Sequence, residues 1–385
     1  MITSISRINR ISKIYFVFLI LFSFAVNPFT KAQSEELTNM DNPFGVLEFL
    51  HWNHSWNSYK YSSIADWDKV IKLMKEAGVG WVRMDFLWED IEPKKGELTF
   101  EKYDQVVDLL HKNNIHILGI LDYSVEWAAA CKKWNCPPKD NGLFVKYATR
   151  VILRYKDKIK HWEVWNEPDS GVYWLEQDGL KSYCALLRDV YLAAKKTDPD
   201  CKILNGGLAS GLSSVNLLYD NGAKNYFDIL NIHFFESPLH GAGVIKAVTN
   251  YPKLAHKIME RNGDGKKKIW ITEIGCPGVR PGVKADNWWL GKNPSEKQQE
   301  EWVKKVYPEL LKDKNVEKLF WAFFRDCSGH WGTGVDYFGL IRWDYSRKPG
   351  FKAYKECFKQ WEKDKKSKLI SRKPICNKTP KNYNN

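Results

Sequence analysis

The chain has 385 residues, 14% of them aromatic, and a formal net charge of +13 at pH 7. This length suits one large α/β domain or two ordinary ones and allows a sizeable buried core. The charge does not indicate nucleic-acid binding, because residues 1–32 contribute +4 and residues 363–385 contribute +7, which leaves +2 for the rest. We expect no nucleic-acid partner, and we expect the basic tail, 363–385, to be solvated and disordered.

Residues 1–32 resemble a secretory signal peptide. Basic residues precede the uncharged apolar run IYFVFLILFSFAV (14–26), and Thr30 and Ala32 occupy the −3 and −1 positions of a cleavage site. The run is short for a membrane-spanning helix, and no later segment is apolar enough to cross a bilayer. The sequence therefore predicts a secreted or periplasmic monomer with no stable membrane insertion after the signal is removed.

From residue 45 onward, strand and helix patterns alternate eight times. The expected strands cover 45–50, 79–86, 115–123, 160–167, 201–207, 227–235, 267–275 and 316–324. The expected helices cover 63–78, 99–114, 143–155, 180–196, 213–222, 244–262, 294–312 and 349–362. Alternation of this kind predicts a parallel sheet with right-handed crossovers.

Eight strand–helix units favour a (β/α)8 barrel, or TIM barrel, formed as a single domain by residues 33–362 with long loops after the strands. A doubly wound open sheet is the alternative, but no Gly-x-Gly-x-x-Gly motif follows the first strand. Catalytic residues of such barrels lie at the C-terminal ends of the strands. The polar and aromatic residues at these ends are His51, Asn53, Arg83, Asp85, Asp122, Tyr123, Asn166, Glu167, Asn205, His233, Glu273, Trp321 and Arg325.

Cysteine spacing permits disulfide bonds in an exported chain, which has eight cysteines. Cys131 and Cys136 could close the short segment CKKWNC into a surface loop. The other pairs that are neat in sequence are Cys184–Cys201, Cys276–Cys327 and Cys357–Cys376. No Cys-x-x-Cys or His-x-x-x-His spacing indicates a metal site, and we expect neither a metal nor a cofactor.

Two strand ends carry glutamates: Glu167 in HWEVWNEPDSG (161–171) and Glu273 in IWITEIG (269–275). Side chains alternate between the two faces of a regular strand. Glu163 and Glu167 would therefore share one face, Asn166 would lie on the other, and Pro168 would end the strand. Carboxylates on strands 4 and 7 that face each other fit a retaining glycosidase, in which one protonates the leaving oxygen and the other attacks the anomeric carbon.

The chain resembles the glycoside hydrolases of clan A, most of all family 39 and its exopolysaccharide-degrading relatives. The resemblance covers about residues 43–360 and is carried by WVRMDFLWEDIEPKKGELTFEKYDQVVDLL, EVWNEPD, IWITEIG and DYFGLIRWDYSRKPGFKAYKE. It implies that Glu167 is the acid/base and Glu273 the nucleophile. It further implies that Asn166 binds the sugar 2-hydroxyl and that Arg83 keeps the nucleophile ionised. A structural ion pair between Arg83 and Glu163 is the alternative, and the two roles are compatible.

The same resemblance implies that His233 lines the mouth at strand 6 and that Trp321 forms a platform under the sugar. Both are also common in purely structural roles. Many relatives carry a tyrosine two residues after the histidine, where this chain has Phe235. Tyr123 or Tyr337 would then supply the missing hydroxyl, or the nucleophile lacks that contact.

Further substrate contacts are expected from Tyr123, Trp88, Trp127 and Asn205, and some of the other tryptophans in predicted loops should form sugar subsites. These others are Trp134, Trp174, Trp288, Trp289 and Trp331. The sequence thus predicts a secreted retaining glycoside hydrolase that acts on a polysaccharide or oligosaccharide, with long loops that favour a groove and internal cleavage. The alternatives are an exo-acting, xylosidase-like β-glycosidase, a transglycosylase and a catalytically inactive carbohydrate-binding barrel.

Overall fold

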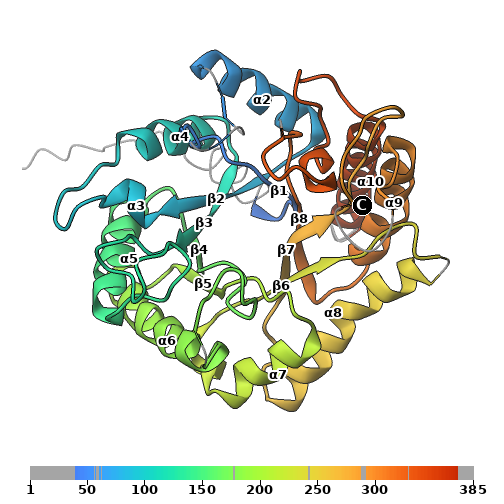
Figure 1. The fold of residues 1–385 in the computed structure, drawn as a ribbon. Coiled ribbons are helices and arrows are strands. Elements are labelled where there is room, and N and C mark those ends of the chain that lie inside the picture. Colours follow the sequence, from blue (N-terminus) through green and yellow to red (C-terminus); the bar gives the residue numbers. More distant parts are fainter. Residues whose placement is uncertain are drawn as a thin grey trace, which may run out of the picture.

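The structure, a computed structural model, describes residues 40–371 apart from positions 56, 58, 59, 62, 177, 242, 288–291 and 328. Eight parallel strands form one sheet that closes into a ring, and helices surround it (Figure 1). The predicted (β/α)8 barrel is therefore confirmed. The predicted signal peptide lies outside the described residues. Among the described helices, none combines the length and the apolar content needed to cross a bilayer.

Each predicted strand and helix is present, with boundaries that shift by a few residues. The strands are β1 (Phe44–Leu47), β2 (Trp81–Leu87), β3 (His116–Asp122), β4 (His161–Val164), β5 (Lys202–Asn205), β6 (Leu230–Phe235), β7 (Ile269–Gly275) and β8 (Val316–Trp321). The helices are α2 (Ile64–Ala77), α3 (Trp88–Ile91), α4 (Glu101–Lys112), α5 (Asn141–Tyr155), α6 (Leu180–Thr197), α7 (Leu212–Asp220), α8 (Val244–Arg261), α9 (Glu296–Leu310) and α10 (Pro349–Ser371), with the short 3-10 helices η1 (Ala223–Tyr226) and η2 (Gly334–Tyr337).

Helices α3 and α10 differ most from the prediction. The short helix α3, which follows β2 directly, was not predicted. Helix α10 continues beyond residue 362 to Ser371, so this part of the expected disordered tail is helical. Its added turns place charges favourably, because Lys365 pairs with Asp41 at 3.2 Å and Lys366 pairs with Glu362 at 3.1 Å.

The barrel closes between β5 and β6 without a continuous ladder. Hydrogen-bonded neighbours follow the order β5-β4-β3-β2-β1-β8-β7-β6. Across the remaining junction, isolated bridges join Leu204 to Ile229 and Leu208 to Ile232. The Asn205 side chain completes the closure, because its Nδ2 donates to the Asn231 carbonyl and its Oδ1 accepts from the Asn231 N–H, each at 2.9 Å. Asn205 therefore acts as a substitute for strand backbone.

The barrel interior below the mouth is filled by large apolar side chains: Trp81, Leu118, Leu204, Ile229, Trp270 and Phe320. Alternate residues of a strand share a face. On β2, Arg83 and Asp85 consequently follow Trp81 on the inner face and rise towards the mouth. On β3, Ile120 and Asp122 follow Leu118 in the same way. The packed floor thus holds polar side chains at the C-terminal ends of the strands.

Only one of the expected disulfide bonds is present among the described residues. Cys131 and Cys136 are bonded, as predicted. Cys184, Cys201, Cys276, Cys327 and Cys357 are free and buried, so the pairs Cys184–Cys201 and Cys276–Cys327 are wrong. Cys184 faces away from β5, since its Sγ approaches the Leu218 carbonyl on α7 at 4.0 Å. The suggested partner of Cys357, Cys376, lies outside the described residues.

Candidate active site

The chain after β4 leaves regular strand geometry before it reaches Glu167. Trp165 and Glu167 have φ angles of 67° and 43°, a region that residues with a Cβ adopt rarely and at a cost. Regular alternation would have put Asn166 on the face opposite Glu163, and that prediction is wrong. The irregular backbone turns Asn166 inward, and Arg83 Nη2 donates to both Asn166 Oδ1 at 2.7 Å and Glu163 Oε1 at 2.8 Å.

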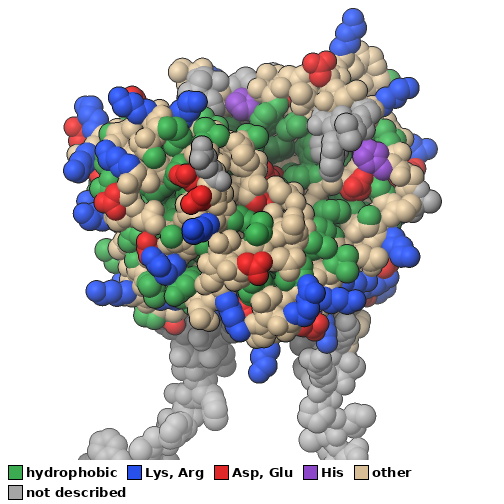
Figure 2. Space-filling model, turned by 60° about the horizontal axis from the view of Figure 1, so that its bottom comes forward, with side chains coloured by type: hydrophobic (Ala, Val, Ile, Leu, Met, Phe, Trp, Pro, Cys, Tyr) green, Lys and Arg blue, Asp and Glu red, His purple; other side chains and the backbone are tan. Residues whose placement is uncertain are grey.

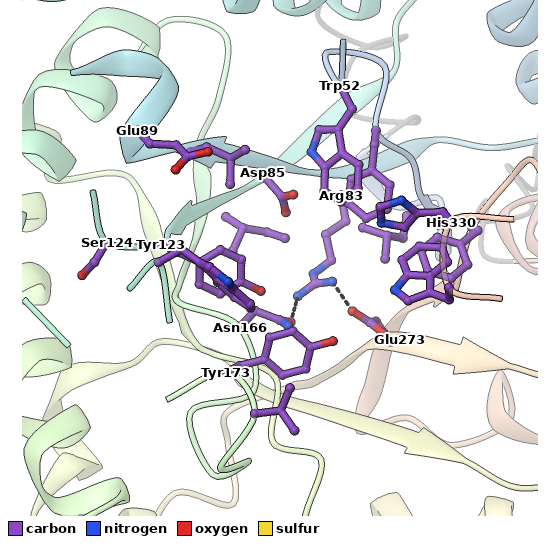
Figure 3. Close-up of a pocket in the computed structure, with 18 residues that line it drawn as sticks. Trp52, Arg83, Asp85, Glu89, Tyr123, Ser124, Asn166, Tyr173, Glu273 and His330 are labelled. Carbon is purple, nitrogen blue, oxygen red and sulfur yellow. Dashed lines mark hydrogen bonds and ion pairs between the residues drawn. The ribbon is translucent and has the colours of Figure 1, made fainter. Parts of the chain in front are cut away.

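Arg83 connects three strands beneath the mouth (Figure 3). Its Nε donates to Glu163 Oε2 at 2.7 Å, and its Nη1 donates to Glu273 Oε1 at 2.6 Å. The arginine is 1% exposed. Burial opposes its charge, but the carboxylates of Glu163 and Glu273 outweigh burial and raise the pKa of Arg83. The ion pair with Glu163 is therefore present, and the same arginine places a positive charge against Glu273.

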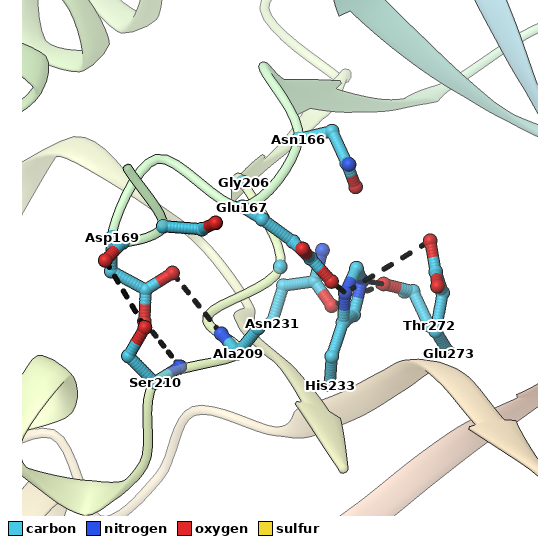
Figure 4. Close-up of polar contacts among 12 residues, drawn as sticks. Asn166, Glu167, Asp169, Gly206, Ala209, Ser210, Asn231, His233, Thr272 and Glu273 are labelled. Atoms are coloured by element: carbon cyan, nitrogen blue, oxygen red, sulfur yellow. Dashed lines mark hydrogen bonds and ion pairs between the residues drawn. The ribbon is translucent and has the colours of Figure 1, made fainter. Parts of the chain in front are cut away.

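His233 on β6 links Glu167 to the barrel wall (Figure 4). Its Nδ1 lies 2.8 Å from Glu167 Oε1, and its Nε2 lies 3.0 Å from Thr272 Oγ1. Thr272 in turn donates to Asn231 Oδ1 at 2.6 Å. This chain of hydrogen bonds fixes the orientation of the imidazole ring. His233 was predicted to line the mouth, and it contacts the acid/base candidate Glu167 directly.

The environments of Glu167 and His233 shift their protonation. Burial raises the pKa of Glu167, the hydrogen bond from His233 opposes this rise, and the charge of Glu273 adds to it. Burial alone would lower the pKa of His233, but Glu273 and Glu167 more than compensate, and the net shift is upward. A carboxyl that holds its proton above the usual pH range suits a general acid.

Glu167, His233 and Glu273 are the described group with side chains close enough to hold a metal ion. One ligand atom from each lies within 4.8 Å of the others. Both nitrogens of His233 are already engaged in hydrogen bonds, so a metal would have to displace one of these partners. The hydrogen bonds instead suit a pair of carboxyl groups that act on the two atoms of one substrate bond.

Arg83, Asn166 and Glu273 line a cavity of about 690 Å³, whereas Glu167 and His233 are not among its lining residues. Tyr123, Trp134 and Tyr173 line one side, and aromatic rings that include Trp52, Phe323 and Trp331 line the other. Figure 2 shows a hollow, bordered by hydrophobic side chains, in the upper part of the face it presents. The volume falls within the range of sites that bind organic ligands.

Besides His233, four further predicted contact residues lie outside this lining. Trp321 is fully buried, packs against Trp302 on α9 and donates from Nε1 to the Phe338 carbonyl at 2.7 Å. It faces the helices because Phe320 occupies the inner face of β8. Phe323, with a φ of 64°, takes the place at the cavity and stacks on Trp331 at 4.8 Å between ring centroids.

The other three also serve packing or closure. Trp88 is fully buried and stacks on Tyr147 at 5.3 Å. Trp127 packs edge-on against Trp88 and donates to the Glu92 carbonyl at 3.0 Å. Asn205 uses its amide to close the barrel. Of the further loop tryptophans, Trp174 is buried, Trp134 and Trp331 line the cavity, and Trp288 and Trp289 lie outside the described residues.

Tyr173 is a site residue that the sequence did not reveal. Its hydroxyl points towards Glu273 in Figure 3. Burial, followed by the charges of Glu167 and Glu273, raises its pKa. It approaches from the loop after Glu167, whereas Phe235 packs on Phe338 at 5.7 Å. A tyrosine six residues after a catalytic motif carries no spacing signal, because its direction depends on the irregular turn at 165–167.

Comparison with known proteins adds a family to this geometry. A family model described as "Glycosyl hydrolase catalytic core" matches residues 138–336, slightly more than half of the chain. The chain belongs to this glycosyl hydrolase family. A second model, described as "Beta-galactosidase", matches residues 55–120, which precede the region matched by the first model.

Individual relatives of this glycosyl hydrolase are distant. The 6-phospho-beta-glucosidase of Clostridium longisporum is 32% identical over 110 residues, which cover 27% of this chain and 23% of that protein. Endo-1,4-beta-xylanase 2 of Claviceps purpurea is 26% identical over 273 residues, which cover 66% of this chain and 77% of the relative.

A solved structure of a family 39 glycoside hydrolase from Bacteroides cellulosilyticus WH2 has a TM-score of 0.61 at 22% identity, covering 83% of this chain and 64% of that one. The resemblance to family 39 that the motifs indicated thus extends to the barrel fold. The matched region spans less than two thirds of the family 39 chain and less than a quarter of the phosphoglucosidase.

Proposed function

We propose that this glycosyl hydrolase cleaves O-glycosidic bonds with retention of configuration, with Glu167 as acid/base and Glu273 as nucleophile. The observation that carries the proposal is the proximity of the two glutamates: one carboxylate oxygen of each lies within 4.8 Å of the other and of a ring nitrogen of His233. Retaining enzymes hold their carboxyl groups about 5–5.5 Å apart, and inverting enzymes about 6.5–9.5 Å apart. Two oxygens this close agree better with the retaining range, which supports double displacement.

In the first step, Glu273 attacks the anomeric carbon as the bond from that carbon to the glycosidic oxygen breaks. Glu167, whose pKa burial raises, gives its proton to the departing oxygen. The products of this step are a glycosyl ester on Glu273 and an ionised Glu167. In the second step, Glu167 removes a proton from water, the water oxygen bonds to the anomeric carbon, and Glu273 leaves as a carboxylate.

The surrounding residues position and charge this pair. Arg83 donates to Glu273, which favours the ionised nucleophile. His233 holds Glu167 in place through its hydrogen bond, and this bond lowers the pKa of the carboxyl against the rise that burial causes. Asn166 accepts a hydrogen bond from the same arginine, and its amide would contact a hydroxyl of the reacting sugar.

The substrate in this proposal is a β-linked polysaccharide, cut internally by a secreted monomer. Aromatic side chains lie on both sides of the Arg83–Glu273 pair (Figure 3), and flat apolar rings stack on sugar rings. Platforms on both sides favour sugar units that continue past the cleaved bond in two directions. The match to a protein named as an endo-1,4-beta-xylanase adds support for internal cleavage.

The test is a panel of activated 2-fluoro-2-deoxy glycosides with intact-mass detection. The fluorine slows breakdown of the ester, so the wild type should gain the mass of one sugar and Glu273→Gln should not. Glu101→Gln, a change of the same kind at an exposed site on α4, is the control and should keep the adduct. An adduct that persists in Glu273→Gln would contradict the assigned nucleophile.

Product analysis tests the rest of the proposal. Oligosaccharides of several lengths from a β-linked polymer would support internal cleavage, whereas release of single sugars alone would establish exo action. Longer chains than those supplied would establish transglycosylation.

A further inference from the structure

The charges that face the cavity are almost all negative. Among the described lining residues, the charged ones are Arg83, Asp85, Glu89 and Glu273. The positions within 40–371 that the structure does not describe contain no Lys or Arg. The single guanidinium is committed, since it donates to Glu163, Asn166 and Glu273 and is 1% exposed. His330 also lines the cavity, and burial lowers its pKa, which keeps the ring neutral.

Asp122 lies on the inner face of β3, beside Asp85 on β2. In the register of the two strands, Asp85 is opposite Ile120 and Asp122 is opposite Leu87. Asp122 shares the inner face with Ile120, and Ile120, Asp85 and Leu87 all line the cavity. Asp122 is fully buried, and neither of its carboxyl oxygens has a hydrogen-bond partner in the described part of the chain. Buried polar groups are normally hydrogen-bonded, so the Asp122 carboxyl is an unpartnered group next to Asp85, although Asp122 itself does not line the cavity.

Burial shifts the pKa values of Asp85 and Asp122. Burial raises the pKa of Asp85 to about 7, Arg83 opposes the rise and Glu273 adds to it. Burial and then the neighbouring Asp85 raise the pKa of Asp122. The wall therefore resists any further negative charge, while a hydroxyl or ammonium group can donate hydrogen bonds to it.

We infer that the wall formed by Asp85 and Glu89, with the buried Asp122 next to Asp85, restricts this site to uncharged or amino-bearing sugars and rejects uronic acids and sulfated sugars. The inference rests on the proposed glycosidase function and adds a substrate class to it. A uronate carboxylate would lose hydration beside Asp85 and find no unengaged cation among the described lining residues. Such like-charge juxtaposition is how a binding site excludes a near-isostere.

The rejection should depend on pH. An anionic sugar binds more easily when Asp85 is protonated, and Asp85 gains its proton as the pH falls through about 7. Hydrolysis of a uronide, relative to that of its neutral counterpart, should consequently rise below pH 7. A packing role for Asp85 would leave this ratio independent of pH.

The experiment compares matched aryl glycosides that differ only at C6: glucoside against glucuronide, and galactoside against galacturonide. The neutral member should have the higher kcat/KM by about 10- to 100-fold, the size of a like-charge effect on a neighbouring group. Asp85→Asn should narrow this ratio by about 10-fold. Asp157→Asn is the control; it removes an exposed charge in the turn before β4, at the opposite end of the barrel.

A uronide that reacts as well as its neutral counterpart would overturn the inference, and so would a ratio that Asp85→Asn leaves unchanged. Failure of the proposed function looks different, because every glycoside would then be inert and no sugar adduct would form on Glu273. In that case binding decides, through the tryptophan fluorescence of the full chain with cellotetraose or tetragalacturonic acid. Stronger binding of cellotetraose supports the charge selection, and equal or stronger binding of the acid overturns it.

Discussion

The two ends of the barrel bury ionisable groups in opposite ways. At the C-terminal end, Arg83 forms hydrogen-bonded ion pairs with Glu163 and Glu273. At the N-terminal end, His161 stacks on Trp270 at 5.0 Å, and Lys318 lies 5.2 Å from the centre of the Trp81 ring. Burial, followed by the charge of Lys318, lowers the pKa of His161 to about 3, so the ring is neutral.

This contrast shows what each end does with the same scaffold. Opposite charges joined by hydrogen bonds remain ionised when buried, and they provide the electrostatics of a reaction. Histidines among aromatic rings lose their charge and become packing material. The floor of the barrel can thus be rigid and apolar while the mouth stays reactive, and each end should respond differently to substitution.

The largest effect should follow from Glu163→Gln. This change leaves Arg83 buried without its main counter-ion, and breaking a buried pair costs about 3–5 kcal/mol. Arg83 would also lose the charge-assisted hydrogen bonds to Glu163 that fix its guanidinium, which disturbs its contact with Glu273. We therefore expect kcat to fall by about 100-fold or more, in line with a stabilisation of about 2.7–4 kcal/mol lost at a reacting group. Steady-state kinetics and urea unfolding measure the two losses. Glu300→Gln on the surface of α9 is the control, and wild-type kcat in Glu163→Gln would refute the role of the network.

Tryptophans at the two ends should separate stability from binding. Trp270→Ala at the floor removes a side chain that is 1% exposed and should lower the free energy of unfolding by about 3–5 kcal/mol. Trp134→Ala at the rim, where the side chain is 45% exposed, should leave stability nearly unchanged and raise KM for long substrates. Urea unfolding and kinetics of both variants check this reciprocal pattern. Equal losses of stability would erase the distinction between floor and rim.

The floor should also make stability depend on pH. Burial lowers the pKa of His116 to about 4 and that of His161 to about 3. In the unfolded chain both bind protons below about 6.5, whereas the folded chain excludes them. The free energy of unfolding should therefore decrease as the pH is lowered from about 6.5 to 4, by about 1.4 kcal/mol per pH unit and per histidine.

Urea unfolding at several pH values measures this slope, and His161→Asn should reduce it. His111→Asn, at an exposed site on α4, is the control for the loss of a histidine. A slope that is the same in wild type and His161→Asn would show that the buried ring does not exclude its proton.

The smallest effect should come from the disulfide loop at the rim. Cys131–Cys136 closes the loop that carries Trp134, whose carbonyl accepts from the Ser124 N–H at 2.8 Å. Cys131→Ser should loosen the placement of this ring beside Tyr123 and raise KM for oligosaccharides a few-fold, about 1 kcal/mol or less. Hydrolysis of a simple aryl glycoside is the internal control and should keep its kcat. An unchanged KM for oligosaccharides of every length would show that the disulfide is not needed to position Trp134.

Local patterns were sufficient to predict the barrel and its central residues. Apolar spacing located the strands, and the motifs located Glu167, Glu273, Asn166, Arg83 and His233, all of which the structure brings into one connected network. These residues lie at or just after strand ends, which a local pattern can locate, although the direction of Asn166 depended on the irregular backbone at 165–167.

The rim was less predictable because its geometry is not local. Trp321 was expected at the cavity, but which face of β8 points inward is decided by Phe320 and the packing of α9. Phe323 and Tyr173 reach the cavity through backbone turns that leave no periodic signal. Asp122 stood among the polar strand ends, yet its lack of a partner emerges only when β2 and β3 are in register.

The closure through Asn205 gives the barrel a seam. Every other pair of neighbouring strands is joined by a ladder, whereas β5 and β6 share isolated bridges and one side-chain amide. Amide protons along this seam should exchange before those of the other strands. Glu167 and His233 stand on opposite sides of the seam, and the hydrogen bond between them spans it. A sugar that contacts both Glu167 and His233 would link the two sides of the seam, so substrate binding should stabilise the closed barrel, and a closed barrel should in turn favour binding.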